Sequence, residues 1–217
     1  MKAIDSLAAL TDLGRVRLSD NFFMRDMLYS EVANFYRIPN IPEEPDLAIE
    51  AGTKLCCLVL EPLLRWFGHI TIRSAYRSPT LNAHCHKLYS EGVRDAWCTS
   101  NDDNAAYHIW DLRDTSGRLG ATATIIIPAY IEHFRATQEW RPLGWWMRDH
   151  LADYAHIQFF SKLCAFNIGW REGENDQQIG FLDPPTRELL TKRGDPFFAG
   201  PHLEAYEHVP ILTEERK

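Results

Sequence analysis

The sequence "ITIRSAYRSPTLN" at residues 70–82 joins a strand pattern directly to a helix pattern, and it is the stretch that decides the fold. Residues 69–76 alternate between apolar and polar side chains and are rich in β-branched residues, which is typical of a β-strand. Residues 78–88 predict a short helix that follows at once. Arg73 and Arg77 lie at this junction, where paired N–H donors could bind a carboxylate or phosphate, or simply solvate a surface turn.

The residues on either side of this stretch predict an α+β domain. Residues 45–67 have apolar side chains at helical spacing and predict a long core helix that ends at Gly68. Residues 106–114 and 120–127 predict two strands of an antiparallel hairpin, and residues 154–160 predict another strand. We therefore expect N-terminal helices, followed by a small, mostly antiparallel sheet with interspersed helices.

The domain is predicted to cover residues 1–171, and residues 172–217 form a proline-rich C-terminal extension. The composition after Trp170 is polar and contains repeated prolines. Such a composition indicates an extended tail that is packed on the domain or partly disordered.

The overall charge and the cysteines limit the partners that we expect. A formal net charge of −7 argues against nucleic acid and anionic membrane surfaces as partners. The odd number of cysteines, 5 in total, and the absence of a signal-peptide pattern predict a cytoplasmic protein with reduced thiols. A small-molecule or peptide substrate is the expected partner.

The stretch "AAYHIWDLRD" at residues 105–114 contains a candidate metal-ligating histidine. In a regular strand, alternation places His108 and Asp111 on opposite faces. They could share a metal ion only if the chain bends after Trp110, in which case Asp111 or Asp114 would be the carboxylate ligand. The alternative is a buried structural histidine.

A second candidate lies in "DHLADYAHIQFF" at residues 149–160. Asp153 and His156 are three residues apart, where a predicted helix is followed by a strand. A carboxylate beside a metal-binding histidine can deprotonate a metal-bound water. The alternative is an acidic residue at a helix end and a half-buried histidine on a strand.

Taken together, these stretches resemble the zinc D-Ala-D-Ala peptidases, a family that shares its fold with the Hedgehog signalling domain. The resemblance covers roughly residues 17–170, and its most specific part is "IRSAYRSPTLN" at residues 72–82, which is close to the family pattern S-G-Y-R-S-x-x-L-N. It implies that Arg77, together with Arg73 and Ser78, binds the carboxylate of a substrate.

The same resemblance implies a zinc site, with one departure from the family pattern. His108 matches the histidine of the motif S-x-H-x-x-G-x-A-x-D, but Thr115 or Thr124 stands at the aspartate position. Zinc would be held by His108, His156 and Asp111 or another nearby aspartate, and Asp153 would be the catalytic base.

Three functions remain open from the sequence. The first is a metal-dependent hydrolase of a small peptide or amide with a free carboxylate. The second is a metal-free family member that binds a ligand, a cell-wall fragment or a protein without hydrolysis. The third is another enzyme of small-molecule metabolism, with His108 and Asp111 as acid and base.

Overall fold

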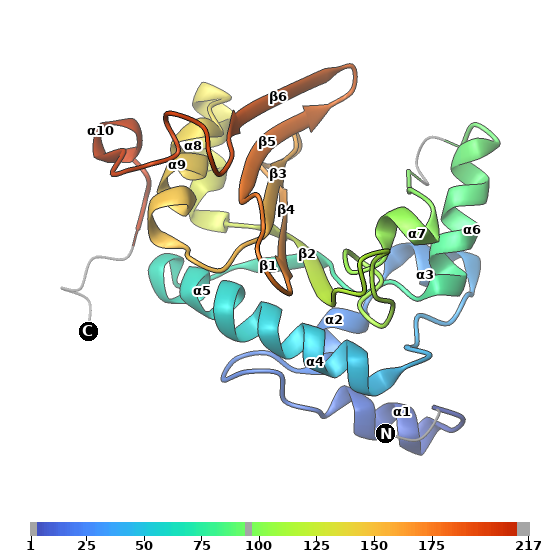
Figure 1. The fold of residues 1–217 in the computed structure, drawn as a ribbon. Coiled ribbons are helices and arrows are strands. Elements are labelled where there is room, and N and C mark those ends of the chain that lie inside the picture. Colours follow the sequence, from blue (N-terminus) through green and yellow to red (C-terminus); the bar gives the residue numbers. More distant parts are fainter. Residues whose placement is uncertain (1–3, 94–96, 212–217) are drawn as a thin grey trace.

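The fold is α+β and is organised around one mixed sheet of six strands (Figure 1). A computed structural model describes residues 4–93 and 97–211. The strand order is β1-β2-β4-β3-β5-β6, and neighbouring strands are antiparallel except for the parallel pair β3 and β5. The strands are β1 (Thr71–Ser74), β2 (Gly120–Ile126), β3 (His156–Phe159), β4 (Phe166–Arg171), β5 (Gln178–Asp183) and β6 (Thr186–Thr191).

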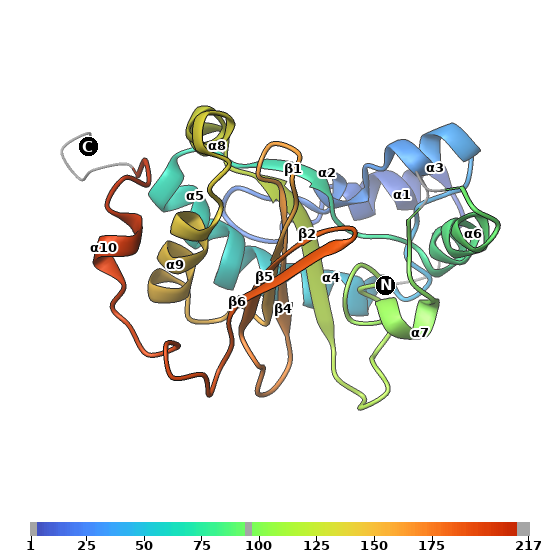
Figure 2. The same ribbon diagram turned by 90° about the horizontal axis from the view of Figure 1, so that it is seen from above.

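Helices lie on both sides of this sheet. Viewed from above, α8, α9 and α10 lie on one side, and α3, α6 and α7 lie on the other (Figure 2). The helices are α1 (Leu7–Gly14), α2 (Met24–Leu28), α3 (Glu31–Tyr36), α4 (Pro45–Leu55), η1 (Cys56–Leu60), α5 (Glu61–Phe67), α6 (Pro79–Ser90), α7 (Asn101–Asn104), η3 (Pro128–Tyr130), α8 (Ile131–Thr137), α9 (Arg141–His150) and α10 (Leu203–Tyr206).

The predicted long helix over residues 45–67 is confirmed as α4, the π-helical turn η1 and α5, which follow one another without a break. Gly68 ends it with φ 71°, a left-handed conformation that glycine adopts without strain. Gly52 of α4 lets the buried Trp110 ring pack closely, because a Cβ atom at this position would lie 2.8 Å from the ring. The helix thereby covers the apolar face of the sheet.

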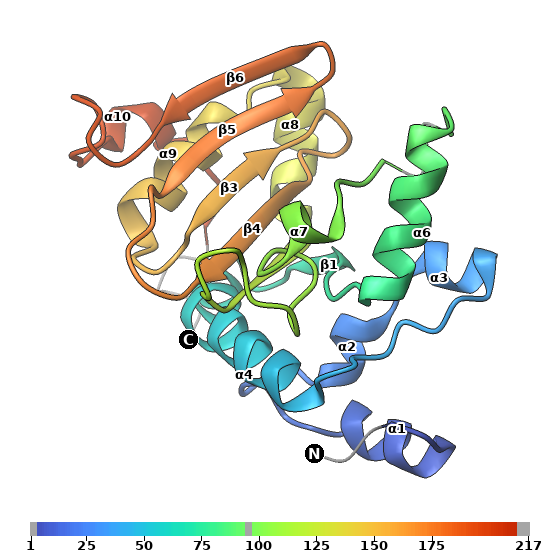
Figure 3. The same cartoon turned by 45° about the vertical axis from the view of Figure 1, so that its right-hand side comes forward.

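The two faces of the sheet differ in chemistry because side chains alternate along each strand. The inner face is mainly apolar, and eight of its side chains are 2% exposed or less, namely Ala121, Ala123, Ile125, Ile157, Phe159, Phe166, Ile168 and Ile179. The outer face carries Thr122, Thr124, His156, Gln158 and Asn167 instead. Figure 3 shows this outer face, with α7 and the loop after it in front of β4 and with α8 and α9 behind the sheet.

Residues 106–114 do not form the predicted strand, and the predicted hairpin with residues 120–127 is wrong. The segment is a series of tight turns, and β2 pairs with β1 and β4 instead. The turns close because the carbonyl of Asn104 accepts hydrogen bonds from the backbone N–H groups of Tyr107 and Ile109, each at 3.1 Å. Apolar alternation here reflects side chains that pack in turns, not a pleated strand.

The prediction of an extended tail is wrong for residues 178–191, which form β5 and β6 of the same sheet. Ile179 of β5 is fully buried, so this part of the chain completes the hydrophobic core. Within residues 4–93 and 97–211, every helix is too short or too polar to span a bilayer.

Candidate functional site

The outer face of the sheet holds His156 over a strand position that lacks a side chain. His156 of β3 pairs with Gly169 of β4, and Gly169 pairs with Thr122 of β2. A Cβ atom at Gly169 would collide with the imidazole of His156. The ring therefore lies across β4, and its Nε2 atom is 3.4 Å from Oγ1 of Thr122. Glycine at this position permits the close approach.

His108 reaches the same face from the turns that follow α7. Its Nδ1 atom lies 2.8 Å from the carbonyl oxygen of Ala75. Because a carbonyl can only accept a hydrogen bond, Nδ1 carries the proton of the neutral ring and Nε2 keeps a lone pair. Gly120 makes room for this turn, because a Cβ atom there would collide with the carbonyl of Ala106.

Both imidazoles are neutral at pH 7. Burial, followed by the positive charge of Arg77, lowers the pKa of His108 to about 4. Burial, followed by the charges of Arg171 and His108, lowers the pKa of His156 to about 3. The ring of His108 therefore lies close enough to His156 to disfavour a charge on it. We call His108 and His156 the histidine pair.

An aromatic ring and a guanidinium group complete one side of the histidine pair. The ring of Tyr107 lies 4.6 Å from that of His156, measured between centroids. The Cζ atom of Arg171 lies 4.2 Å from the Tyr107 ring centroid, which is a cation–π contact. This arrangement fixes a positive charge beside the histidine pair.

Asp111 is buried in a different polar cluster. Its carboxylate accepts hydrogen bonds from the Tyr76 hydroxyl at 3.0 and 3.1 Å and from the backbone N–H groups of Glu43 and Glu44 at 2.8 and 3.3 Å. Burial raises the pKa of Asp111, and these hydrogen bonds oppose the rise. The carboxylate therefore satisfies the first N–H groups of the segment that begins α4. The zinc-site prediction requires this carboxylate beside the histidine pair, but its hydrogen-bond partners are Tyr76, Glu43 and Glu44.

The other predicted carboxylates also have separate surroundings. Asp114 accepts hydrogen bonds from the backbone N–H groups of Ser116 and Arg118, each at 2.9 Å, and pairs with the Arg118 guanidinium at 3.0 Å. Asp153 is exposed and lines a pocket with Tyr154, whereas His156 lines a neighbouring one.

The side chains around the histidine pair do not make a complete zinc site. Catalytic zinc takes three protein ligands, usually from histidine, cysteine, aspartate or glutamate. Among the residues that the structure describes, no three such side chains gather. The nearest polar neighbours are the hydroxyl of Thr122 and the amide of Asn167. The charges of Arg77 and Arg171 further disfavour a cation at this position.

A separate pocket of about 400 Å³ lies beside the end of β1. Three cationic side chains line it, namely Arg73, Arg77 and Lys162, together with Trp97 and Thr124. We call this the cationic pocket. Its volume lies in the range of small-molecule sites in proteins, which is roughly 300–1,000 Å³.

The charges of the cationic pocket are only partly balanced. Glu31 and Asp183 also line it, and both are exposed. In the described part of the chain, none of the three cationic side chains forms an ion pair. The pocket thus has guanidinium and ammonium groups available for an anionic ligand.

The cationic pocket is connected to the histidine pair through the sheet. The hydroxyl of Thr124, which lines the pocket, donates a hydrogen bond to Asn167 Oδ1 at 2.6 Å. The Asn167 side chain is also hydrogen-bonded to His108. A ligand in contact with Thr124 would therefore be separated from His108 by two side chains, those of Thr124 and Asn167.

A buried asparagine of the "RSPTLN" motif holds Arg77 in place. Nη1 of Arg77 donates to Cys98 Sγ at 2.9 Å and to Asn82 Oδ1 at 3.4 Å. The same Asn82 oxygen accepts from Asn104 Nδ2 at 2.6 Å. These contacts leave the rest of the guanidinium at the pocket wall. Asn82, which is fully buried, thus acts as scaffolding.

Ser78, which was predicted to bind the ligand, caps α6 in the structure instead. Its side chain accepts a hydrogen bond from the N–H of Leu81 at 3.3 Å and forms the N-cap of α6. Its hydroxyl also donates to the carbonyl of Pro39 at 3.1 Å. Ser78 is 2% exposed and does not line the cationic pocket.

Three residues that the sequence did not single out, Lys162, Trp97 and Thr122, complete the two sites. Lys162 lies in the turn between β3 and β4, and Trp97 lies on the segment before α7. Thr122 and Thr124 alternate along β2, so the pattern "GATATI" already implied that both face the same side of the sheet. Lys162 and Trp97 reach the pocket through tertiary contacts, and no local sequence pattern around them indicates this.

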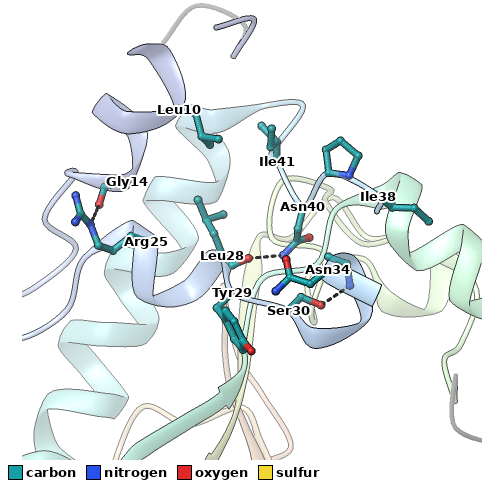
Figure 4. A pocket seen from close by; sticks show the side chains of 12 residues that line it. Leu10, Gly14, Arg25, Leu28, Tyr29, Ser30, Asn34, Ile38, Asn40 and Ile41 are labelled. Atoms are coloured by element: carbon teal, nitrogen blue, oxygen red, sulfur yellow. Dashed lines mark hydrogen bonds between the residues drawn. The ribbon is translucent and has the colours of Figure 1, made fainter. Parts of the chain in front are cut away.

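Another pocket of about 460 Å³ lies between α1, α2 and α3 (Figure 4). Two of its polar side chains are held by the protein itself. Arg25 Nε donates to the carbonyl of Gly14 at 3.1 Å, and Asn40 Nδ2 donates to the carbonyl of Leu28 at 3.0 Å. Most of its remaining wall is apolar, so it offers less charge to a ligand than the cationic pocket does.

Comparisons of the chain with protein-family models, with curated proteins and with solved structures gave no match.

Proposed function

We propose that the protein binds a small ligand with a free carboxylate in the cationic pocket and does so without a catalytic metal. The observation that carries this proposal is the gathering of Arg73, Arg77 and Lys162 without ion-pair partners among the described residues. A carboxylate would be held by paired N–H donors, and the Trp97 ring would contact the apolar part of the ligand.

The scaffold that we propose is that of the zinc D-Ala-D-Ala peptidases. The support is the order of the long helix, the strand with "RSAYRSPTLN" and the antiparallel strands β2, β4 and β3. His108 and His156 lie near each other on this scaffold although they are 48 residues apart in the sequence. On this basis we propose that the ligand is a dipeptide or a cell-wall fragment that ends in a carboxylate.

A metal-dependent hydrolase of the same ligand class is the second candidate. It is favoured by one observation: Nδ1 of His108 is hydrogen-bonded to the carbonyl of Ala75, which orients the ring. Metal-bound histidines are commonly oriented by such a bond from the other ring nitrogen to a backbone carbonyl. If zinc were bound, it would polarise the scissile carbonyl and activate water, and Asp153 would have to approach the site to act as base.

Isothermal titration calorimetry tests the proposed function. The probes are D-alanyl-D-alanine and its C-terminal amide, which lacks the carboxylate charge. We expect the dipeptide to bind, the amide to bind at least about tenfold more weakly, and added salt to weaken only the dipeptide. Equal affinity for both probes, or no binding of either, would contradict the proposal.

Single substitutions locate the binding site. Arg73→Ala and Lys162→Ala remove exposed cations from the pocket wall, and we expect each to weaken the dipeptide about tenfold. Arg25→Ala is the matched control, because Arg25 lines the pocket between α1, α2 and α3 instead. A loss of affinity in the control that equals the loss in Arg73→Ala would move the binding site elsewhere.

A further inference from the structure

Three threonines could occupy the position of the missing metal ligand, and their environments differ. Thr115 is exposed in a turn. Thr124 donates its hydroxyl hydrogen bond to Asn167 and lines the cationic pocket. Thr122 is fully buried, and its hydroxyl oxygen is 3.4 Å from His156 Nε2. Of the three threonines, only Thr122 has its hydroxyl oxygen in contact with a ring nitrogen of the histidine pair.

The separation between Thr122 and His156 is the one that two zinc ligands require. With metal–ligand bonds of roughly 2.0–2.2 Å, two ligand atoms at adjacent corners of a tetrahedron lie about 3.4 Å apart. The observed distance between Thr122 Oγ1 and His156 Nε2 has this value. A neutral hydroxyl, however, is a weak zinc ligand and does not compensate the charge of a cation.

We propose that the histidine pair is a two-ligand half-site whose third position is Thr122, and that this residue prevents the chain from retaining zinc. The sequence alone pointed to Thr115 or Thr124 instead. A carboxylate or thiolate at position 122 would complete a three-ligand set with His108 and His156. The inference concerns only the histidine pair, so it does not depend on whether the cationic pocket binds a carboxylate.

Zinc content and cobalt spectra test the proposal directly. The untagged chain is stripped with a chelator, dialysed against zinc sulfate and analysed for metal. We expect about one zinc per chain in Thr122→Asp and no stoichiometric zinc in the wild type. Cobalt(II) should give the intense visible absorption of a tetrahedral site only in Thr122→Asp. Addition of His108→Ala to this variant should abolish both signals.

Thr124→Asp is the matched control, because residue 124 lies on the same face of the same strand. We expect it to retain no zinc. The proposal is overturned if Thr124→Asp binds zinc and Thr122→Asp does not. It is also overturned if the wild type holds about one zinc per chain that is lost in His156→Ala, and this result would favour the hydrolase.

A second variant keeps the test decisive if the buried aspartate prevents folding. Thr122→Cys replaces threonine by a side chain of similar size that binds zinc as a thiolate. Circular dichroism establishes whether each variant is folded. A folded Thr122→Cys protein that retains no zinc overturns the assignment of residue 122 as the third position.

Discussion

His108 and Asp111 are three residues apart in one turn segment, yet they belong to two polar clusters that are built differently. The Asp111 carboxylate accepts hydrogen bonds from three donors, the Tyr76 hydroxyl and the N–H groups of Glu43 and Glu44. His108 is hydrogen-bonded to the Ala75 carbonyl through Nδ1 and to the Asn167 side chain, and His156 has a 3.4 Å contact to Thr122 through Nε2. The Asp111 cluster is saturated within the protein, whereas His156 is held by one long contact through Nε2.

This difference distinguishes polar residues that stabilise the fold from polar residues that can bind a ligand. A buried polar group whose hydrogen bonds are all made within the fold stabilises one conformation. A buried polar group that keeps an unused lone pair is a candidate for ligand binding or catalysis. We therefore assign Asp111 to the stability of the fold and keep the histidine pair as the candidate functional site.

The largest effect that we predict is the loss of stability in Asp111→Ala. The substitution leaves three buried or partly buried donors without their acceptor, and each net hydrogen bond contributes about 1 kcal/mol. We expect the free energy of unfolding to fall by about 3 kcal/mol, as measured by urea denaturation at pH 7. Asp102→Ala is the control, because Asp102 is exposed, and it should change the value by less than about 0.5 kcal/mol.

An effect of Asp111→Ala that is as small as the control would show that Asp111 does not hold α4. Loss of dipeptide binding in a folded Asp111→Ala protein, without loss of stability, would instead show that Asp111 belongs to the functional site.

The next effect is a decrease in stability on mild acidification, caused by the histidine pair. Because the folded-state pKa values of His108 and His156, about 4 and about 3, lie below the ordinary value of about 6.5, the unfolded chain binds protons first. The stabilising contribution is therefore present above pH 6.5 and decreases as the pH falls. At pH 5 each histidine should reduce the free energy of unfolding by about 2 kcal/mol.

Glutamine variants isolate this contribution from that of other groups. His108→Gln and His156→Gln cannot be protonated, so each should show a smaller decrease between pH 7 and pH 5 than the wild type. His86→Gln, at an exposed position on α6, is the control and should leave the decrease unchanged. If the two site variants behave like the control, the histidine pair is not buried in its neutral form.

Local patterns in the sequence predicted most elements that the structure contains. Apolar spacing identified the helix over residues 45–67, and β-branched alternation identified β1, β2 and β3. These elements are decided by side chains that are neighbours in sequence. The strands at residues 178–191 were not predicted, because β5 depends on parallel pairing with β3. Pairing of this kind leaves no local pattern in a proline-rich segment.

The candidate site was predictable only in part for the same reason. Arg73 and Arg77 were found because they are close in sequence, and they line one pocket. His108 and His156 were found because each has an aspartate three residues away in the sequence, and the family resemblance then placed them in one site. Asp111 was misplaced because a bend after Trp110 was expected to bring it to His108, whereas the tight turns at residues 105–110 direct its carboxylate to the N–H groups of Glu43 and Glu44.

The smallest effect that we predict tests whether the two clusters are independent. Tyr76→Phe removes one donor to Asp111 but leaves Glu43 and Glu44, so unfolding should cost about 1 kcal/mol less than in the wild type. Tyr107→Phe is the matched control, because its ring contact with His156 does not need the hydroxyl. Histidine ring signals in ¹H–¹⁵N NMR spectra should stay unchanged in Tyr76→Phe, because separate clusters contribute additively. A shift of the His108 signals as large as that caused by Thr122→Asp would mean that the saturated cluster and the histidine pair form one network.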